Sequence, residues 1–343
     1  MKSGCYTALI TPFKDDLVDY DGLAKLSDFQ IANKITGILA AGTTGESPTL
    51  AWDEHNKVTE IIADKSKGNC FCIAGTGSNN TKEALSATKH ACDAGVDAIL
   101  LVDPYYNGPS SLEIRKEYIE PVVKTFPDIE VIPYIIPGRT GAQLLPEDLA
   151  ILNDTYGNLN SVKEATGNID NMKRTRKVCG PDFIIYSGDD GMVFEMMTDP
   201  EIKANGLISV ASNIAPKAVS ELLQLLENGD TDEAKKLNTK LQPLFNITTV
   251  VTTESTPYGD VQCRARNPLG AKTLMRILGM PAGGCRQPLG KMTLNGVNYV
   301  LDIAKSVQKE TPDLFLPIAE FFNIDIEERL NDPKVIETLY YKD

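Results

Sequence analysis

A lysine closes a short run of strand-forming residues in the segment 161–167, which reads Ser-Val-Lys-Glu-Ala-Thr-Gly. We interpret this segment as a strand that ends at Lys163 and opens into a turn. At the carboxyl end of a barrel strand, such a lysine faces the mouth where ligands bind. Burial there disfavours the ammonium form, so the amine can attack a carbonyl carbon. Taken alone, the same seven residues also describe a surface lysine beside a surface glutamate.

Hydroxyl, phenol and guanidinium groups follow three other strand-like segments. Residues 42–47 read Gly-Thr-Thr-Gly-Glu-Ser, where two hydroxyls and free backbone amides form a cradle suited to a carboxylate. Tyr134 and Arg139 end another strand, and together they offer a proton carrier and a carboxylate clamp. Tyr105 and Tyr106 follow a further strand and point to opposite faces of it. An ordinary turn, a surface arginine and interface packing are the alternative interpretations.

Histidine and cysteine usage limits the other kinds of chemistry. The chain has only two histidines, His55 and His90, and both lie in segments with helical periodicity. A metal site of the histidine-rich kind, zinc-dependent aldol chemistry and a Ser-His-Asp triad are therefore disfavoured. We expect no metal and no cofactor. Seven cysteines without a repeated Cys-x-x-Cys spacing indicate free thiols in a reducing cytoplasm.

The overall charge bears on the partners. The 343 residues carry a net charge of -13, which disfavours nucleic acid and anionic membrane surfaces. No apolar run is long enough to span a bilayer, and no signal peptide is recognisable before the first strand-like segment. We expect a cytoplasmic protein that acts on small molecules, including anionic ones that respond to local charge.

The elements that would position these groups recur along the chain. Apolar, strand-like runs alternate with segments whose apolar residues recur at three- and four-residue spacing. The predicted strands are 6–10, 37–40, 70–74, 98–102, 130–135, 160–163, 183–187 and 206–210. Their starts are about one strand and one crossover helix apart. Eight such units predict a closed (β/α)8 barrel of the α/β class.

The remaining residues exceed what a barrel needs. We divide the chain into a barrel (1–227), a helical C-terminal extension (228–310) and an acidic tail with aromatic residues (311–343). The extension is expected to contain helices over 231–251, after Asn267-Pro268, and over 295–309. The tail is either a set of added helices or a docking segment. Packed helices are favoured because the aromatic side chains would otherwise be exposed.

Four motifs in this order resemble one known family. They are GTTGES at 42–47, PYYN at 104–107, YIIPGRTG at 134–141 and VKEATGN at 162–168. They are similar to the dihydrodipicolinate synthase branch of the N-acetylneuraminate lyase superfamily, and the resemblance extends from about residue 4 to about residue 293. The family consists of pyruvate-dependent Schiff-base aldolases on a (β/α)8 barrel with a helical extension. Two departures are Ile135, where the family usually has asparagine, and the tail after about Ser306.

The resemblance implies a role for each matching residue. Lys163 would form the Schiff base with pyruvate, while Tyr134, Thr43 and Tyr106 would relay protons, the last across a subunit interface. Substrate-binding positions would be Thr44, Arg139, Gly188 and Ile208. Arg139 would hold the carboxylate of L-aspartate 4-semialdehyde, whose condensation with pyruvate leads to diaminopimelate and lysine. A homo-oligomer, dimer or tetramer, is implied as well.

The resemblance also implies a regulatory site. In lysine-inhibited members it lies at a subunit interface, and the matching residues are Ser47, Trp52, His55, Asn79, Glu83 and Tyr105, with Trp52 in place of a histidine. An acid, an amide and a tyrosine suit an amino-acid zwitterion, so L-lysine is a candidate effector. The alternative is that these are interface residues without a ligand.

Three functions remain open at this stage. The first is the synthase, favoured by Arg139 and by the KEATG form of the lysine motif, which the sialic acid lyase branch lacks. The second is another Schiff-base lyase that acts on a 2-keto-3-deoxy acid. The third is a catalytically silent barrel with a binding role, because a fold alone does not fix a function.

Overall fold

In the computed structural model, which describes residues 1–342, eight parallel strands form a closed barrel. Around the barrel the strands run in the order β1-β10-β9-β8-β7-β6-β5-β4, and β1 closes it by pairing with both β10 and β4. Their bounds are β1 Gly4–Ala8, β4 Gly37–Ala40, β5 Phe71–Gly75, β6 Ala98–Val102, β7 Glu130–Ile135, β8 Ser161–Glu164, β9 Ile184–Ser187 and β10 Gly206–Ser209. All eight predicted strands are confirmed to within two residues at each end.

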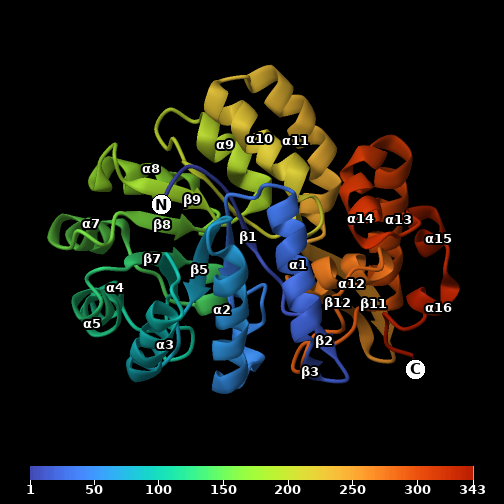
Figure 1. The fold of residues 1–343 in the computed structure, drawn as a ribbon, viewed down its shortest axis with the longest axis horizontal. Helices are drawn as coiled ribbons and strands as arrows, with labels where there is room; N and C mark the ends of the chain where they lie inside the picture. Colours follow the sequence, from blue (N-terminus) through green and yellow to red (C-terminus); the bar gives the residue numbers. More distant parts are fainter. Residues whose placement is uncertain (343) are drawn as a thin grey trace.

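Helices surround the barrel on its outer side (Figure 1). Their bounds are α1 Tyr20–Ala32, α2 Trp52–Ser66, α3 Thr81–Asp93, α4 Ser111–Glu113, α5 Glu120–Thr125, α6 Pro137–Thr140, α7 Pro146–Thr155, α8 Ile169–Cys179, α9 Val193–Thr198 and α10 Pro216–Asn228. Asparagine or aspartate side chains cap several of them; Asp19 accepts the Gly22 amide and Asn80 accepts the Lys82 amide. The predicted (β/α)8 barrel is confirmed.

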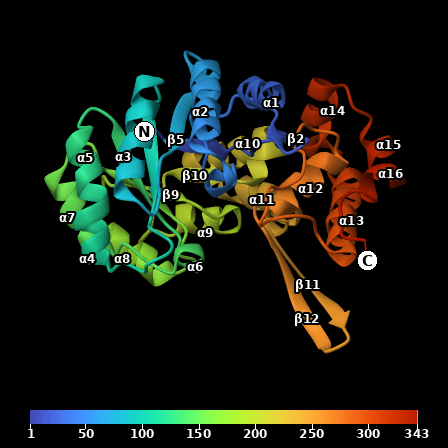
Figure 2. The same ribbon diagram turned by 90° about the horizontal axis from the view of Figure 1, so that it is seen from below.

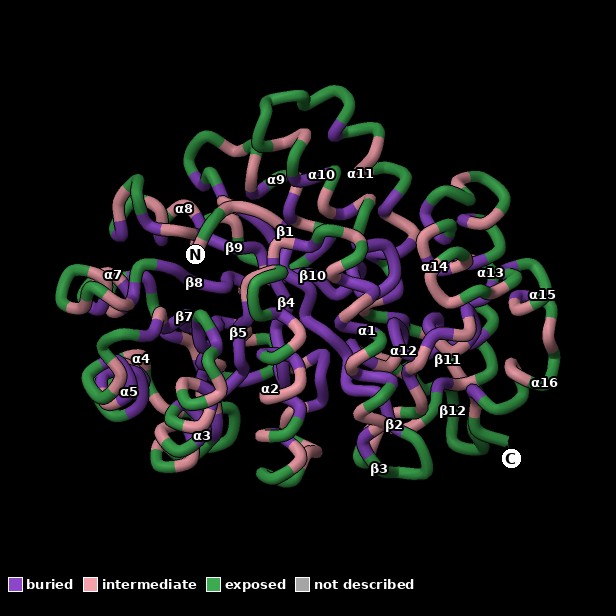
Figure 3. The backbone as a smooth tube through the Cα atoms, viewed as in Figure 1, coloured by how far each residue is buried: buried purple, intermediate pink, exposed green. Residues whose placement is uncertain are grey.

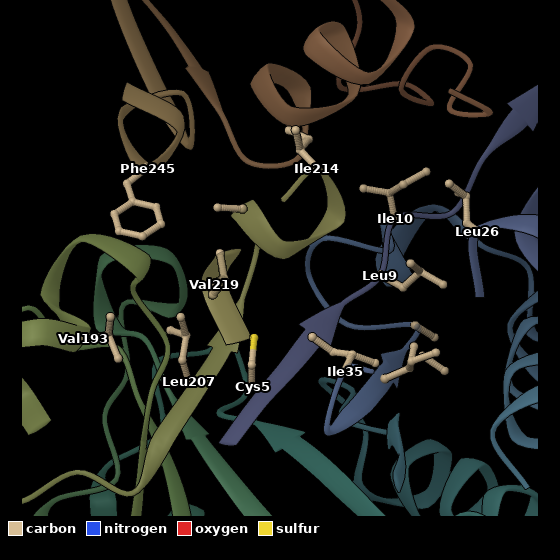
Figure 4. Packing of buried hydrophobic residues seen from close by; sticks show 14 of the residues in the cluster. Cys5, Leu9, Ile10, Leu26, Ile35, Val193, Leu207, Ile214, Val219 and Phe245 are labelled. Carbon is tan, nitrogen blue, oxygen red and sulfur yellow. The ribbon is translucent and has the colours of Figure 1, made fainter. Parts of the chain in front are cut away.

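Apolar side chains fill the layer between strands and helices. Figure 3 shows the buried backbone at the centre of the molecule and exposed residues on the outer sides of the helices. Cys5 on β1 and Leu207 on β10 lie next to each other and below Val219 of α10 (Figure 4). All three are at most 1% exposed. Because the strands are covered on both faces, they contain few polar positions, which made them recognisable from the sequence.

Tyrosines close the interior of the barrel at its amino-terminal end. Tyr6 on β1 and Tyr186 on β9 are fully buried, and their rings meet edge to face at 5.4 Å. Both hydroxyls donate to the carbonyl oxygen of Lys2, each at 2.8 Å. Ligands therefore approach the interior from the opposite end, where the strands finish.

The extension differs from its prediction in one element. Its helices are α11 Thr231–Asn246, α12 Leu269–Ile277 and α13 Leu294–Glu310. The predicted helix over 231–251 is wrong in its last part, because α11 ends at Asn246 and an antiparallel hairpin follows. The hairpin consists of β11 Thr249–Thr256 and β12 Gly259–Arg266. Figure 2 shows it projecting from the body. A shorter hairpin, β2 Phe13–Lys14 with β3 Leu17–Val18, follows β1.

The tail packs on the body as helices, as favoured from the sequence. Its elements are α14 Leu316–Phe322, α15 Ile326–Leu330 and α16 Pro333–Ile336, which lie beside α13 (Figure 1). Phe315 is fully buried, and Phe321 and Phe322 lie 5.4 and 5.2 Å from the Phe29 ring of α1. Arg329 donates to the carbonyls of Arg276 and Ile277 at the end of α12. Within residues 1–342 no helix is both long and apolar enough to cross a membrane.

Candidate active site

A cavity of about 210 Å³ opens at the carboxyl ends of the strands. Five of the predicted site residues line it, namely Thr44, Tyr134, Arg139, Lys163 and Gly188. A second cavity of about 200 Å³ lies next to it and shares Tyr134, Ile136 and Arg139 with the first. The structure therefore gathers residues from loops spread over much of the barrel into one place.

Lys163 is the buried amine of this site. It is 4% exposed, and on β8 it pairs in register with Tyr134 of β7 and Tyr186 of β9. Its Nζ lies 4.2 Å from the centre of the Tyr134 ring. Burial lowers the pKa of Lys163 to about 7; Asp190 opposes this shift and Arg139 adds to it. A large fraction of the amine is therefore neutral and nucleophilic near neutral pH.

Asp190 is a buried carboxylate that the cavity also includes. It accepts hydrogen bonds from the Ser209 hydroxyl (2.5 Å) and the Val210 amide (2.9 Å). Burial raises its pKa to about 6, although these hydrogen bonds favour the charged form. The acidic pair Asp189-Asp190 thus serves helix N-termini, since Asp189 caps the next turn by accepting the Gly191 amide.

Tyr134 is suited to proton transfer because it lies near the Arg139 guanidinium and the Thr43 hydroxyl. It is 4% exposed, and burial raises its pKa, while Arg139 and the neighbouring Thr43 hydroxyl lower it. Thr43 lines the second cavity together with Tyr134. The phenol and this hydroxyl therefore lie where protons can pass between the two cavities.

Asn267 joins the two groups expected to hold carboxylates. Its side-chain amide donates to the Thr44 hydroxyl at 3.0 Å, and its carbonyl accepts from Arg139 at 3.0 Å. Asn267 follows β12, so the extension completes the mouth of the barrel. The sequence placed Asn267 before a helix but gave it no role.

Gly188 is needed for close approach at the lysine. A Cβ at this position would lie 2.8 Å from the Ala165 Cβ and 3.1 Å from the Lys163 Cε. Any larger residue would therefore displace the amine or the strand that carries it. Ile208 is buried in the barrel interior beside Tyr134 and Tyr186, but it is not part of the cavity lining, where Val210 lies instead.

A buried ion pair supports the threonine loop from behind. Lys272 of α12 lies 2.7 Å from Glu46, and both side chains are at most 1% exposed. The same Nζ donates to the Thr11 carbonyl at 2.9 Å. The other Glu46 oxygen accepts the Arg286 amide at 2.9 Å. Sequence analysis missed this pair, as well as Arg266 at the cavity, because no local pattern indicates that these residues meet.

Tyr106 is not part of either cavity in the single chain. It is 85% exposed on the loop after β6, whereas the adjacent Tyr105 lines the second cavity. Its predicted role across a subunit interface stays a prediction. Among residues 1–342 no three His, Cys, Asp or Glu side chains are grouped so that they could hold a metal ion.

The six candidate effector residues lie around the second cavity and the nearby ends of α2 and α3. Ser47 and Tyr105 line that cavity. The Trp52 ring lies tilted against the His55 ring with ring centres 5.1 Å apart, and burial lowers the pKa of His55 to about 4. The Asn79 side chain accepts the Tyr105 amide at 2.7 Å, and Glu83 accepts from the Ser78 hydroxyl.

A parallel barrel with one buried, weakly basic amine at its mouth is the arrangement of Schiff-base aldolases. The chain belongs to the dihydrodipicolinate synthetase family, whose model matches residues 1–307. The tail from residue 308 lies outside that match.

Relatives and solved structures agree with this family. The 4-hydroxy-tetrahydrodipicolinate synthase of Methanococcus vannielii is 38% identical over 289 residues, which cover 84% of this chain and 93% of the relative. The pyruvate complex of the chloride-inhibited dihydrodipicolinate synthase from Acinetobacter baumannii superposes with a TM-score of 0.80 at 34% identity, covering 89% of this chain and 98% of that one. DHDPS from Cyanidioschyzon merolae with lysine bound gives 0.80 at 32% identity, covering 89% and 97%.

Proposed function

We propose that this chain condenses pyruvate with L-aspartate 4-semialdehyde to form 4-hydroxy-tetrahydrodipicolinate through a Schiff base on Lys163. The observation that carries the proposal is the buried amine of Lys163, which has a pKa near 7 and faces Tyr134. Family membership and the names of the relatives support the same reaction.

The first half of the reaction uses the lysine. Its neutral amine attacks the keto carbon of pyruvate, and loss of one water leaves an iminium ion. The Thr44 hydroxyl, held by Asn267, and the backbone amides of its loop bind the pyruvate carboxylate. Gly188 leaves room for this adduct next to the lysine.

The second half uses the enamine. Removal of a proton from the pyruvyl methyl group moves the electron pair toward the iminium nitrogen, and the enamine then attacks the aldehyde carbon. Tyr134, with Thr43 beside it, carries protons to and from the reacting atoms. Arg139 binds the carboxylate of the semialdehyde. Attack of the substrate's own amine on the iminium carbon closes the ring and releases Lys163.

Trapping tests this proposal directly. Pyruvate and borohydride should add one reduced pyruvyl group to the Lys163 peptide, and L-aspartate 4-semialdehyde should be consumed in the absence of borohydride. Lys272, the other buried lysine within residues 1–342, is ion-paired and should stay unmodified as an internal control. No adduct on the folded protein would favour the silent barrel instead. An adduct without semialdehyde turnover would favour a lyase for 2-keto-3-deoxy acids.

We further propose that L-lysine binds near Trp52. The lysine-bound relative from Cyanidioschyzon merolae supports this effector. Trp52 is the only tryptophan of the chain and is 42% exposed, so its fluorescence reports on this region. Lysine should change the emission and lower turnover, whereas Glu83→Gln should weaken both effects. The absence of any binding heat at millimolar lysine would contradict the proposal.

Finally, we propose a homo-oligomer in which Tyr106 serves the site of a neighbouring subunit. Its 85% exposure in the single chain supports this assignment. Lys163→Ala and Tyr106→Phe subunits should each be nearly inactive, yet mixed oligomers should regain activity, because one site then has both native residues. If the mixed oligomers stayed as inactive as the two parent variants, this result would contradict the proposal. The free cysteines suit a cytoplasmic location.

A further inference from the structure

The hairpin β11–β12 has two different faces. Eight residue pairs run from Thr249 with Arg266 to Thr256 with Gly259, so alternate pairs share a face. One face contains Val250, which is 2% exposed, and Thr252, whose hydroxyl lies 3.1 Å from that of Thr293. This face packs against the start of α13.

The other face of the hairpin leads into the active site. It contains Arg264 and Arg266, which are two residues apart on β12. Arg264 is exposed and lies outside both cavities, whereas Arg266 lines the cavity that contains Lys163. The hairpin therefore places a guanidinium group at the mouth of the barrel.

Arg266 and Arg139 are two cations of the same cavity that lack acidic partners. Arg266 donates to the carbonyl of Gly138 at 3.0 Å, and Arg139 donates to the carbonyl of Asn267 at 3.0 Å. Within residues 1–342 neither guanidinium lies within 4.0 Å of a carboxylate oxygen, although the chain has 47 acidic residues. Burial lowers the pKa of Arg139, and the positive charge of Arg266 lowers it further. Asp189 and Asp190 also line this cavity, but neither carboxylate is paired with a guanidinium, so the two neighbouring cations favour the binding of an anion between them.

We propose that Arg266 binds the carboxylate of the acceptor aldehyde together with Arg139 and thereby selects acceptors that carry a carboxylate. This inference rests on the proposed function, since it concerns the second substrate of the same site. The pyruvate carboxylate has its own cradle at Thr44, so the two guanidinium groups remain for the acceptor. Arg139 comes from α6, which follows β7, and Arg266 comes from the extension, so both parts of the chain contribute to one specificity site.

The test removes the charge of Arg266 and compares it with a matched position. Arg266→Gln keeps an N–H donor for the Gly138 carbonyl but loses the charge, Arg266→Lys keeps the charge, and Arg264→Gln removes an equal charge outside the cavity. In Arg266→Gln the KM for L-aspartate 4-semialdehyde should rise roughly tenfold to a hundredfold, the loss of a charge-assisted contact. The KM for pyruvate and the extent of pyruvate trapping should be unchanged. The KM of Arg266→Lys for L-aspartate 4-semialdehyde should lie between those of the native sequence and Arg266→Gln. Arg264→Gln should change either KM less than about twofold.

A binding measurement keeps this inference separate from the proposed function. Succinate semialdehyde, which has the carboxylate but no amine, is titrated calorimetrically into protein whose Lys163 has first been trapped with pyruvate. We expect binding to the native sequence and at least tenfold weaker binding to Arg266→Gln. Equal affinity would overturn the role of Arg266, whether or not the native protein turns over L-aspartate 4-semialdehyde. Equal weakening by Arg264→Gln would also overturn it, because it would show a general charge effect.

Discussion

Single residues decide the chemistry of this barrel, and Lys163 shows how burial creates a reagent. The side chain lies among apolar and aromatic groups, where its ammonium form loses hydration. Asp190 favours the charged amine and Arg139 opposes it. The residue types of the site were predictable from the sequence, because they follow the strands in motifs. Asn267 and Arg266 were not, since their roles depend on where a distant segment folds back.

The pH dependence of trapping should report the amine of Lys163. Its neutral fraction rises from about one tenth at pH 6 to about nine tenths at pH 8 for a pKa of about 7. The initial rate of reductive trapping, measured with pyruvate and cyanoborohydride, should rise over the same range. Asp190→Asn should move the midpoint to lower pH, because it removes a carboxylate that stabilises the ammonium form. Asp189→Asn is the control, since Asp189 acts on Tyr134 instead. A midpoint near 10 would contradict the burial argument.

At the scale of elements, burial determines which predictions succeed. The eight barrel strands are covered on both faces, so their apolar runs stand out, and their bounds were predicted to within two residues. The hairpin β11–β12 is mostly exposed, and its alternating polar residues give no apolar run. Its β-branched residues at 248–253 and the Pro257-Tyr258-Gly259 turn were available signals. They were missed because the helical pattern of α11 was extended past Asn246.

The ion pair of Glu46 and Lys272 should hold α12 to the threonine loop. Lys272→Met leaves the Glu46 carboxylate buried without its cation, and this should cost about 3–5 kcal/mol of unfolding free energy. The measurement is urea unfolding at neutral pH. Lys65→Met, which removes a half-exposed pair with Asp28, should cost less than about 1 kcal/mol. The double variant Lys272→Met/Glu46→Gln should recover part of the loss. Equal costs for the two single variants would show that the buried pair has no special role.

At the scale of the whole molecule, the tail and the barrel share one core. Phe315 and Ile318 are fully buried, and the Phe29 ring of α1 lies between the two chain regions. The sequence could predict packed helices here, because the aromatic side chains of the tail would otherwise be exposed. It could not predict which face of the body they cover, because that depends on the position of α1 relative to α13.

Removing one tail side chain should therefore destabilise the entire chain. Phe315→Ala should cost about 3–4 kcal/mol, the range expected for a buried aromatic residue, and unfolding should remain a single transition. Tyr341→Ala, at a position 63% exposed, is the control and should cost less than about 1 kcal/mol. Thermal unfolding followed by circular dichroism measures both. A separate early transition in Phe315→Ala would show that the tail folds independently.

The sealed floor of the barrel also imposes an order of events in time. Tyr6 and Tyr186 close the amino-terminal end by donating to the Lys2 carbonyl, so reactants and water share a single entrance at the carboxyl ends of the strands. The amine of Lys163 lies inside this entrance, whereas the guanidinium groups of Arg139 and Arg266 lie toward its rim. Pyruvate must enter and the first water must leave before the aldehyde occupies the rim. The two substrates therefore bind in order, with water released between the two binding steps. Because of this release, double-reciprocal plots at several pyruvate concentrations should be parallel lines rather than intersecting ones.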